Sequence, residues 1–296
     1  MTQQRVAWIV PRLAAFVVLL IGCWVVPGGS DDFRLDAVVG HALITGVDPL
    51  VPLTELGTSV PYIATRTPIG VALAAPLGLI AQPLRLPSAA IFVALTGLLF
   101  LHLLNSLGVS WWWATAIVVW PFSEVDRHGQ TTFLFGALIL AAVLTDGRPK
   151  LAGFLLALAV GLKLWPALIP LALFATGRRR IAAWTGIWFV ALTTFLLAAT
   201  SITLDGAVAA LTQDIANPAN LSRTPIWLIP PAVIVFFLWA RNQPWLRATA
   251  WSIPAGLALS PVLWAAYLPV LAVPMVLLRN RPDVRTSSTN GGKRPT

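Results

Sequence analysis

The sequence predicts an all-α integral membrane protein with about ten transmembrane helices and with surface helices in a long first outer loop. Hydrophobic residues make up 57% of the 296 residues and charged residues only 10%, and the mean hydropathy is +0.81. This composition excludes an ordinary soluble domain. Most lysines and arginines fall in short segments between the apolar stretches, which is the positive-inside pattern of membrane proteins. The net charge of +9 is therefore attributed to membrane topology and not to nucleic-acid binding.

Several of the apolar stretches that we expect to cross the bilayer are shorter than the roughly 20 residues that a straight crossing needs, so tilt or neighbouring polar mouths must help. The expected spans are residues 6–27, 87–105, 110–122, 129–146, 180–202, 225–241, 247–260 and 262–278. The first stretch is interpreted as a retained span, because no persuasive small-residue cleavage site follows it. Cys23 lies alone inside this stretch and is interpreted as a small buried apolar residue.

Two further apolar stretches, residues 68–82 and 150–176, are assigned by the charges around them. Basic residues flank 150–176 on both sides and should be cytoplasmic, so this segment must cross and return as two short helices. Lys163 then lies near the turn, at the outer face. The parity of crossings requires 68–82 to be an interfacial or re-entrant helix within a long first outer loop, residues 28–86. Both termini are then cytoplasmic, with one membrane domain over 1–278 and a basic, disordered tail over 279–296.

The acidic residues are concentrated on the predicted outer side. All of them except Asp146 and Asp283 fall there, and Asp31 and Asp32 directly follow the first span. Acids at one mouth of an apolar bundle are costly near lipid, so they are candidates for function. For Asp31 an ordinary loop residue or helix cap is an equally open interpretation. Residues 32–45 have helical spacing, which predicts a helix along the membrane surface.

Lys163 is the most informative cation, because it lies in an apolar run where a central charge costs about 2.5–3.5 kcal/mol. We expect it to meet an anion. His128 has two interpretations, a structural hydrogen bonder or a base. For Arg127 beside Glu124 and Asp126, a surface charge cluster of little consequence is the alternative interpretation. The sequence contains no glycine-rich phosphate loop, metal-ligand spacing or nucleophile elbow. No metal site is therefore expected, and an anionic substrate would be bound by side-chain cations.

Short motifs follow one another through most of the chain. They are Gly46-Val47-Asp48-Pro49 after the helix that begins near Asp32, Thr67-Pro68-Ile69-Gly70, Arg85-Leu86-Pro87-Ser88, Gly129-Gln130, Ala152-Gly153, Gly161-Leu162-Lys163-Leu164-Trp165-Pro166, Asn220-Leu221-Ser222 and Ser260-Pro261-Val262-Leu263-Trp264-Ala265-Ala266-Tyr267. In this order they resemble the GT-C superfamily of membrane glycosyltransferases. Within it the chain is most similar to glycosyltransferase family 87, the polyprenyl-phosphomannose-dependent alpha-mannosyltransferases and their relatives. It departs from the family pattern at Asp36, which replaces an aromatic residue, and at Ala265-Ala266, which replaces a histidine pair.

The resemblance implies transfer of a sugar, most simply mannose, from a polyprenyl-phosphate donor to a lipid-linked or cell-envelope glycan at the outer face, without a further cofactor. It implies that the catalytic acid lies in the first outer loop, with Asp32 as the general base and Asp31 as the alternative. Residues expected to bind the donor phosphate are Lys163, Arg66, His128 and Arg127. Residues expected to contact the sugar or acceptor are Gln130, Asn220, Ser222, Trp264 and Tyr267, with Trp165 as a second candidate for stacking.

Two other functions fit the sequence. A lipid-carrier flippase or transporter also uses broken helices around a charge, but no inverted repeat is found and the acids stop at the outer mouth. A non-catalytic family member acting as an assembly partner is the third interpretation. Loss of transfer with normal lipid binding on changing Asp32 would favour the enzyme, and lipid movement without transfer would favour the flippase.

Overall fold

The structure is a computed structural model, and its regular elements are all helices. The residues that it describes are 3–25, 31–58, 67–113, 115, 131–212, 226–260 and 265–279. Within them there are α-helices and short 3-10 helices and no β-strand, so the predicted all-α class is confirmed for this part of the chain. The helices are α1 (Gln3–Val25), α2 (Asp31–Ile44), α3 (Pro68–Gly78), η1 (Gln82–Leu84), α4 (Arg85–Ser106), α7 (Thr132–Leu144), α8 (Pro149–Leu162), η2 (Trp165–Ala167), α9 (Leu168–Ala175), α10 (Arg179–Ala199), α11 (Leu204–Thr212), η3 (Ile226–Leu228), α12 (Ile229–Ala240), α13 (Trp245–Leu259), η4 (Ala265–Leu271) and α14 (Ala272–Arg279).

The predicted spans correspond closely to these helices. Each predicted span overlaps at least one of them, apart from 110–122, most of which lies outside the described residues. Helices α4 and α10 are long and apolar enough to cross a bilayer by themselves. In α10 only 11% of the apolar window is buried, against 44% in α4, so α10 exposes a broad apolar face of the kind that contacts lipid. The fold is thus consistent with a helical membrane protein, and the number of crossings stays a prediction.

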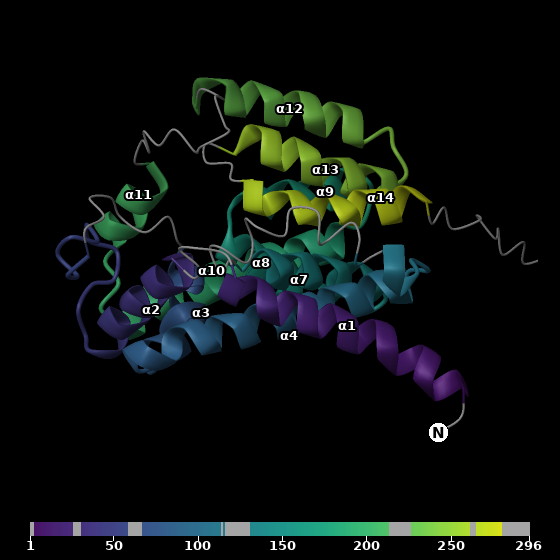
Figure 1. Ribbon diagram of the computed structural model, residues 1–296. Coiled ribbons are helices and arrows are strands. Elements are labelled where there is room, and N and C mark those ends of the chain that lie inside the picture. Colours follow the sequence, from purple (N-terminus) through teal and green to yellow (C-terminus); the bar gives the residue numbers. More distant parts are fainter. Residues whose placement is uncertain are drawn as a thin grey trace, which may run out of the picture.

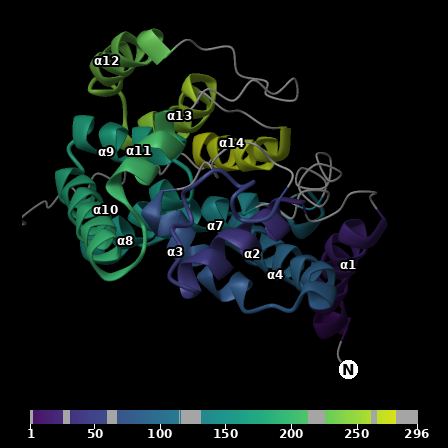
Figure 2. The ribbon, with the colours of Figure 1, turned by 90° about the vertical axis from the view of Figure 1, so that its left-hand side faces the viewer.

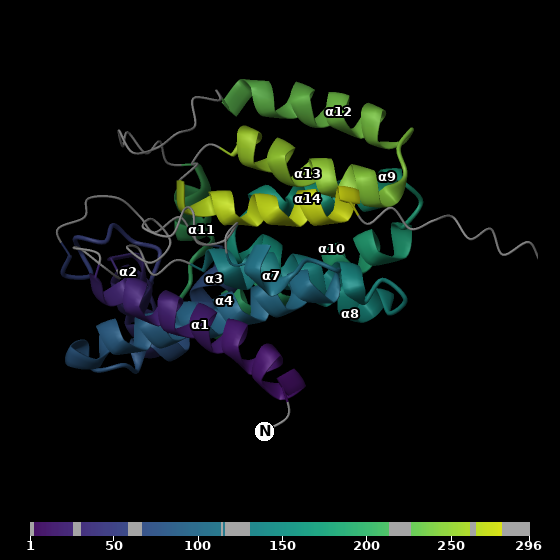
Figure 3. The same ribbon diagram turned by 45° about the vertical axis from the view of Figure 1, so that its right-hand side comes forward.

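The helices α1, α4, α7, α13 and α14 run roughly along one direction, and α2, α11 and the segment after α2 gather at one end of them (Figure 1). Figure 2 looks at the molecule from this end, and Figure 3 shows α12, α13 and α14 on one side of α1, α4 and α7. The main hydrophobic core joins α1, α4, α7, α8, α9, α13 and α14. A second, smaller core joins α2, α3, α10 and α11 at the end that carries α2.

The segment 150–176 folds back on itself, as its charges predicted. Helix α8 ends at Leu162, and Lys163 has an extended backbone (φ −151°, ψ 138°) that stops the helix. After η2, helix α9 returns toward the start of α8. The return is marked by an ion pair in which Arg178 Nη2 lies 3.1 Å from Asp146 Oδ2, so residues that flank the two ends of the segment meet. How deeply this hairpin enters a membrane stays a prediction.

Basic residues gather at the end of the bundle away from α2, and aromatic rings cover them. Lys150 Nζ lies 5.1 Å from the centroid of the Trp184 ring, and Arg178 Cζ lies 4.8 Å from that of Trp245. Cations that snorkel beside aromatic rings are typical of a membrane interface. That these residues share one side of the membrane stays a prediction.

Residues 68–82 contain α3, which at 11 residues is about 16 Å long and too short to cross a bilayer. This length fits the predicted interfacial or re-entrant helix. Helix α3 packs closely on α2 because glycine lies at both contact points: a Cβ on Gly40 would overlap the carbonyl of Ala74, and one on Gly78 would overlap the backbone of His41. Small residues that let two helix backbones approach are a common device of membrane helices.

The predicted surface helix over residues 32–45 is α2. Phe33, Ala37 and Gly40 are buried on one side of it, as the spacing indicated. The Phe33 ring lies 6.0 Å from the Phe92 ring, centroid to centroid, which fixes α2 against α4. The predicted tail lies outside the described residues beyond Arg279.

Candidate functional site

The structure brings together two of the residues singled out in the sequence, Lys163 and Tyr267. Lys163 is half-buried at the end of α8, and its Nζ lies 5.1 Å from the centroid of the Tyr267 ring. Tyr267 belongs to η4 and is only 2% exposed. A cation over the face of a ring is attracted by about 0.5–2 kcal/mol, depending on how dry the contact is. Tyr267 therefore holds the lysine at this end of the bundle.

Further aromatic rings form the wall beside Lys163. Phe135 of α7 makes edge contacts with Trp165 (centroids 5.4 Å apart, 80°) and with Tyr267 (6.1 Å, 74°). Trp165 is buried, and its Nε1 has no hydrogen-bond partner within the part of the chain that the structure describes. Its backbone approaches α13 at Gly256, where a Cβ would lie 2.5 Å from the Trp165 carbonyl oxygen. We call Lys163, Trp165, Tyr267 and Phe135 the lysine cluster.

Thr67 connects the start of α3 to the end of α8. Its hydroxyl accepts a hydrogen bond from the Gly70 N–H (3.2 Å) and so caps α3, and it donates to the Gly161 carbonyl at 2.5 Å. The Gly161 carbonyl is one of the last four of α8 and has no partner within the helix. A Cβ on Gly161 would lie 2.5 Å from Ile69 Cγ2, so glycine is required for the close approach. Two motifs that are distant in the sequence thus meet next to Lys163.

Asp31 and Asp32 form the first turn of α2, and their side chains lie outside the described residues. Helix α2 packs on α3, and α3 is bonded to the end of α8 through Thr67. The second half of α2 and the end of α8 are therefore linked through one short helix, α3.

Asp36 is an acid to which the sequence analysis gave no role. It is 5% exposed and lies one helical turn after Asp32, on the same face of α2. A buried carboxylate is costly unless it is paired or hydrogen-bonded, so Asp36 is expected to be held by such an interaction. The sequence did indicate this burial: Asp36 lies three residues after Phe33 and four before Gly40, so helical spacing places it on the same face of α2 as these two buried residues.

Asp48 of the Gly46-Val47-Asp48-Pro49 motif fixes the segment after α2 to the start of α11. Its carboxylate accepts hydrogen bonds from the Leu50 N–H (2.9 Å), the Thr203 hydroxyl (2.6 Å) and the Thr203 N–H (3.3 Å). The Ser201 hydroxyl donates to the Val47 carbonyl at 2.7 Å. The motif therefore has a structural role in holding the α2 end together.

The other predicted site residues cannot be placed relative to the lysine cluster. They lie outside the described residues: Arg66, Arg127, His128, Gln130, Asn220, Ser222 and Trp264. Within the described part of the chain, no three His, Cys, Asp or Glu side chains lie together in a way suited to a metal ion. Lys163 is a cation held among apolar and aromatic side chains. In such a surrounding the attraction between a cation and an anion is stronger than in water.

The described residues form an all-helical fold with two long apolar helices, which is consistent with a helical membrane protein. The comparison with protein families identifies it further. The chain belongs to glycosyltransferase family 87, whose model matches residues 65–281. This confirms the resemblance and indicates glycosyltransferase activity. The match contains the whole lysine cluster and begins after α2. No curated protein and no solved structure matches the chain.

Proposed function

We propose that this glycosyltransferase moves a sugar, most simply mannose, from a polyprenyl-phosphate carrier to a lipid-linked or cell-envelope glycan at the outer face of a membrane. The observation that carries the proposal is the lysine cluster within the family match. A lipid-phosphate leaving group needs a cation in a partly dry site, and Lys163 is such a cation. A carrier lipid that stays in the bilayer also needs a site at the edge of an apolar bundle.

In the proposed reaction the acceptor hydroxyl oxygen attacks the anomeric carbon, and the bond from this carbon to the phosphate oxygen breaks. Asp32 takes the hydroxyl proton, with Asp31 as the alternative base. The polyprenyl phosphate leaves with the bonding electron pair, and Lys163 stabilises its charge. A single displacement of this kind inverts the anomeric centre and needs no covalent intermediate. A nearby carboxylate also stabilises the oxocarbenium-like transition state.

The remaining predicted residues complete this proposal. Arg66, Arg127 and His128 would share the phosphate charge with Lys163. Gln130, Asn220 and Ser222 would donate or accept hydrogen bonds at sugar hydroxyls, and Trp264 would stack on a sugar face or on the isoprenoid. Because the Tyr267 and Trp165 rings are buried, their position favours holding Lys163 in place over direct contact with the sugar.

The first test is sugar transfer by the purified full chain from a radiolabelled polyprenyl-phosphate-mannose to an envelope lipid extract. We expect Asp32→Asn to lower the rate by about 10²–10⁴-fold, because a positioned general base contributes that much. Asp31→Asn is the neighbouring control and should lose far less. Full transfer by a correctly folded Asp32→Asn variant would overturn the assignment of the base. Movement of carrier lipid across the membrane without transfer would favour the flippase.

The second test concerns the cation. We expect Lys163→Gln to lower transfer by about 10²–10³-fold, as the loss of one charge-stabilising donor does, and Lys163→Arg to keep part of it. Lys150→Gln is a matched control, because Lys150 has the same 5.1 Å contact with an aromatic ring at the opposite end of the bundle. Equal losses from the two glutamine variants would indicate a general effect on folding and would contradict a role at the phosphate.

A further inference from the structure

The start of α7 lies at the same end of the bundle as Lys163. Helices α7 and α8 pack against each other and are joined by residues 145–148, so they run in opposite directions. They contain 13 and 14 residues, which makes each about 20 Å long, and the first turn of α7 is level with the last turn of α8. Phe135, one turn into α7, contacts the rings of Trp165 and Tyr267. The first turn of α7 therefore borders the lysine cluster.

Thr132 is the first residue of α7, and its hydroxyl is buried without a hydrogen-bond partner within the described residues. The residue is 1% exposed. It lies three residues before Phe135, which faces the lysine cluster, and four before Gly136, which packs on Phe100 of α4. Helical spacing places its side chain between these two contacts, and Cα–Cβ bonds tilt toward the start of a helix. The Thr132 hydroxyl is thus directed to the start of α7, beside the lysine cluster.

The start of α7 has more hydrogen-bond donors than the helix can use. Thr96 and Thr185 satisfy their hydroxyls within their helices by donating to the carbonyl four residues earlier, at 2.7 and 2.9 Å. Thr132 opens α7, so its own helix offers no such carbonyl. The first N–H groups of an α-helix also lack a partner within it, and the N-cap Thr131 makes no side-chain cap hydrogen bond. Such helix starts, with the positive end of the helix dipole, bind phosphates.

Hydrogen bonds reduce the negative charge that the last turn of α8 presents to an anion. Its carbonyls form the negative end of the α8 dipole, which would repel a phosphate next to Lys163. The Ala159 carbonyl accepts from the Lys163 N–H at 3.2 Å, and the Gly161 carbonyl accepts from the Thr67 hydroxyl. The Trp165 indole N–H is a second buried donor without a partner within the described residues. Buried donors are rarely left unsatisfied in proteins, so two of them around one cation indicate a bound acceptor.

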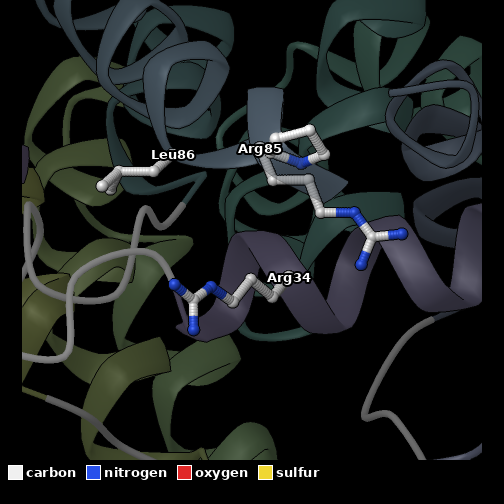
Figure 4. A pocket seen from close by; sticks show the side chains of 4 residues that line it. Arg34, Arg85 and Leu86 are labelled. Carbon is white, nitrogen blue, oxygen red and sulfur yellow. The ribbon is translucent and has the colours of Figure 1, made fainter. Parts of the chain in front are cut away.

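A pocket elsewhere in the fold serves as a comparison. It has a volume of about 350 Å³ and is lined by Arg34, Pro83, Arg85 and Leu86. Its two guanidinium groups point to opposite sides and do not converge on one anion (Figure 4). At the start of α7, by contrast, the ring contacts of Phe135 hold the donors of one helix beside the cation of another. The observations therefore favour the start of α7 as an anion site.

We propose that the start of α7 binds the phosphate of the lipid-linked donor opposite Lys163, with the Thr132 hydroxyl and the first backbone N–H groups as donors to its oxygens. This inference rests on the proposed function, because the phosphate is that of the polyprenyl carrier. The donors hold the phosphate while its charge grows as the bond to the sugar breaks. Arg127, His128 and Gln130 directly precede α7 in the sequence, which fits the roles proposed for them.

The test is binding of farnesyl phosphate, a short polyprenyl phosphate without a sugar, to the purified full chain in neutral detergent, measured by calorimetry. A hydrogen bond to a charged group contributes about tenfold or more to affinity, so Thr132→Val should bind about tenfold more weakly than the unaltered chain. Thr132→Ser keeps the hydroxyl and should bind like the unaltered chain. Thr249→Val is the matched control, because it also removes a buried hydroxyl without a partner in the described residues, and it should leave binding unchanged. Farnesol, which lacks the phosphate, should bind equally to all four proteins.

Equal affinity of Thr132→Val and the unaltered chain for farnesyl phosphate would overturn the inference. A matching loss of farnesol affinity would also overturn it, because the residue would then act on the isoprenoid or through folding. If Thr132→Val does not fold, the smaller Thr132→Ala decides, with the same loss expected. A chain that binds farnesyl phosphate through Thr132 and transfers no sugar refutes only the proposed reaction. A chain that transfers sugar, with Thr132→Val binding normally, refutes only this site.

Discussion

Thr67→Val tests the contact that joins α3 to the end of α8. Valine has the shape of threonine, so the change removes the hydroxyl with little alteration of packing. Thr67 is 3% exposed, and its hydroxyl makes two hydrogen bonds, one to the Gly161 carbonyl at 2.5 Å and one from the Gly70 N–H at 3.2 Å. Loss of a helix N-cap costs about 1 kcal/mol, and a buried carbonyl left without its donor costs about 1–3 kcal/mol. We therefore expect a loss of about 2–4 kcal/mol in the free energy of unfolding.

The assay is denaturant-induced unfolding in a mild detergent, followed by circular dichroism, with hydrogen exchange measured on residues 67–71 and 159–165. Thr67→Ser keeps both hydrogen bonds and should lose about 1 kcal/mol or less, the value of one methyl group. Thr249→Val is the opposite control. Thr249 is fully buried and its hydroxyl has no hydrogen-bond partner among the described residues, so removing it should be neutral or stabilising.

The reasoning is refuted if Thr67→Val unfolds like the unaltered chain while the Gly70 amide keeps its protection from exchange. It is also refuted if Thr249→Val is as destabilising as Thr67→Val, because the loss would then follow from any buried threonine. We further expect Thr67→Val to reduce transfer, since the hydroxyl fixes the backbone two residues before Lys163.

Two further predictions concern the end that carries α2. Gly78→Ala should cost about 1–3 kcal/mol, because its Cβ would overlap the backbone of His41, whereas Gly186→Ala in α10, with nothing within 4 Å, should be neutral or stabilise the chain by up to about 1 kcal/mol. Thermal unfolding of the two variants in the same detergent would contradict this if their midpoints were equal. Asp48→Ala should raise hydrogen exchange in residues 200–207, because the carboxylate accepts from both the N–H and the hydroxyl of Thr203. Unchanged exchange in these residues would mean that the hydrogen bonds between Asp48 and Thr203 are not needed to hold α11 in place.

The positions of the helices followed from the sequence because they depend on local patterns. Hydropathy located the spans, and the basic residues on both sides of 150–176 required the chain to return. The ion pair between Asp146 and Arg178 agrees with that requirement. The break at Lys163 was also visible, since a cation inside an apolar run rarely continues a buried helix.

The contacts between helices did not follow from the sequence. In an apolar chain, the faces that contact lipid and those that contact other helices have similar composition. Nothing in the sequence identified Thr67 as the partner of Gly161, or Asp48 as that of Thr203. Asp36 was missed because it was compared with a family pattern and not with the helical spacing that buries it.

The sequence by itself determined that the chain is helical and apolar, where most of its helices lie, and to which family it belongs. These properties follow from the composition, from the charges between the apolar spans and from the order of the short motifs. The tertiary structure alone decided that Lys163 lies over Tyr267 behind a wall of aromatic rings, and that Arg34 and Arg85 share a pocket. The physical reason is that such contacts depend on how the helices pack against one another at glycines and at hydrogen-bonded helix ends. This packing involves several segments that are distant in the sequence.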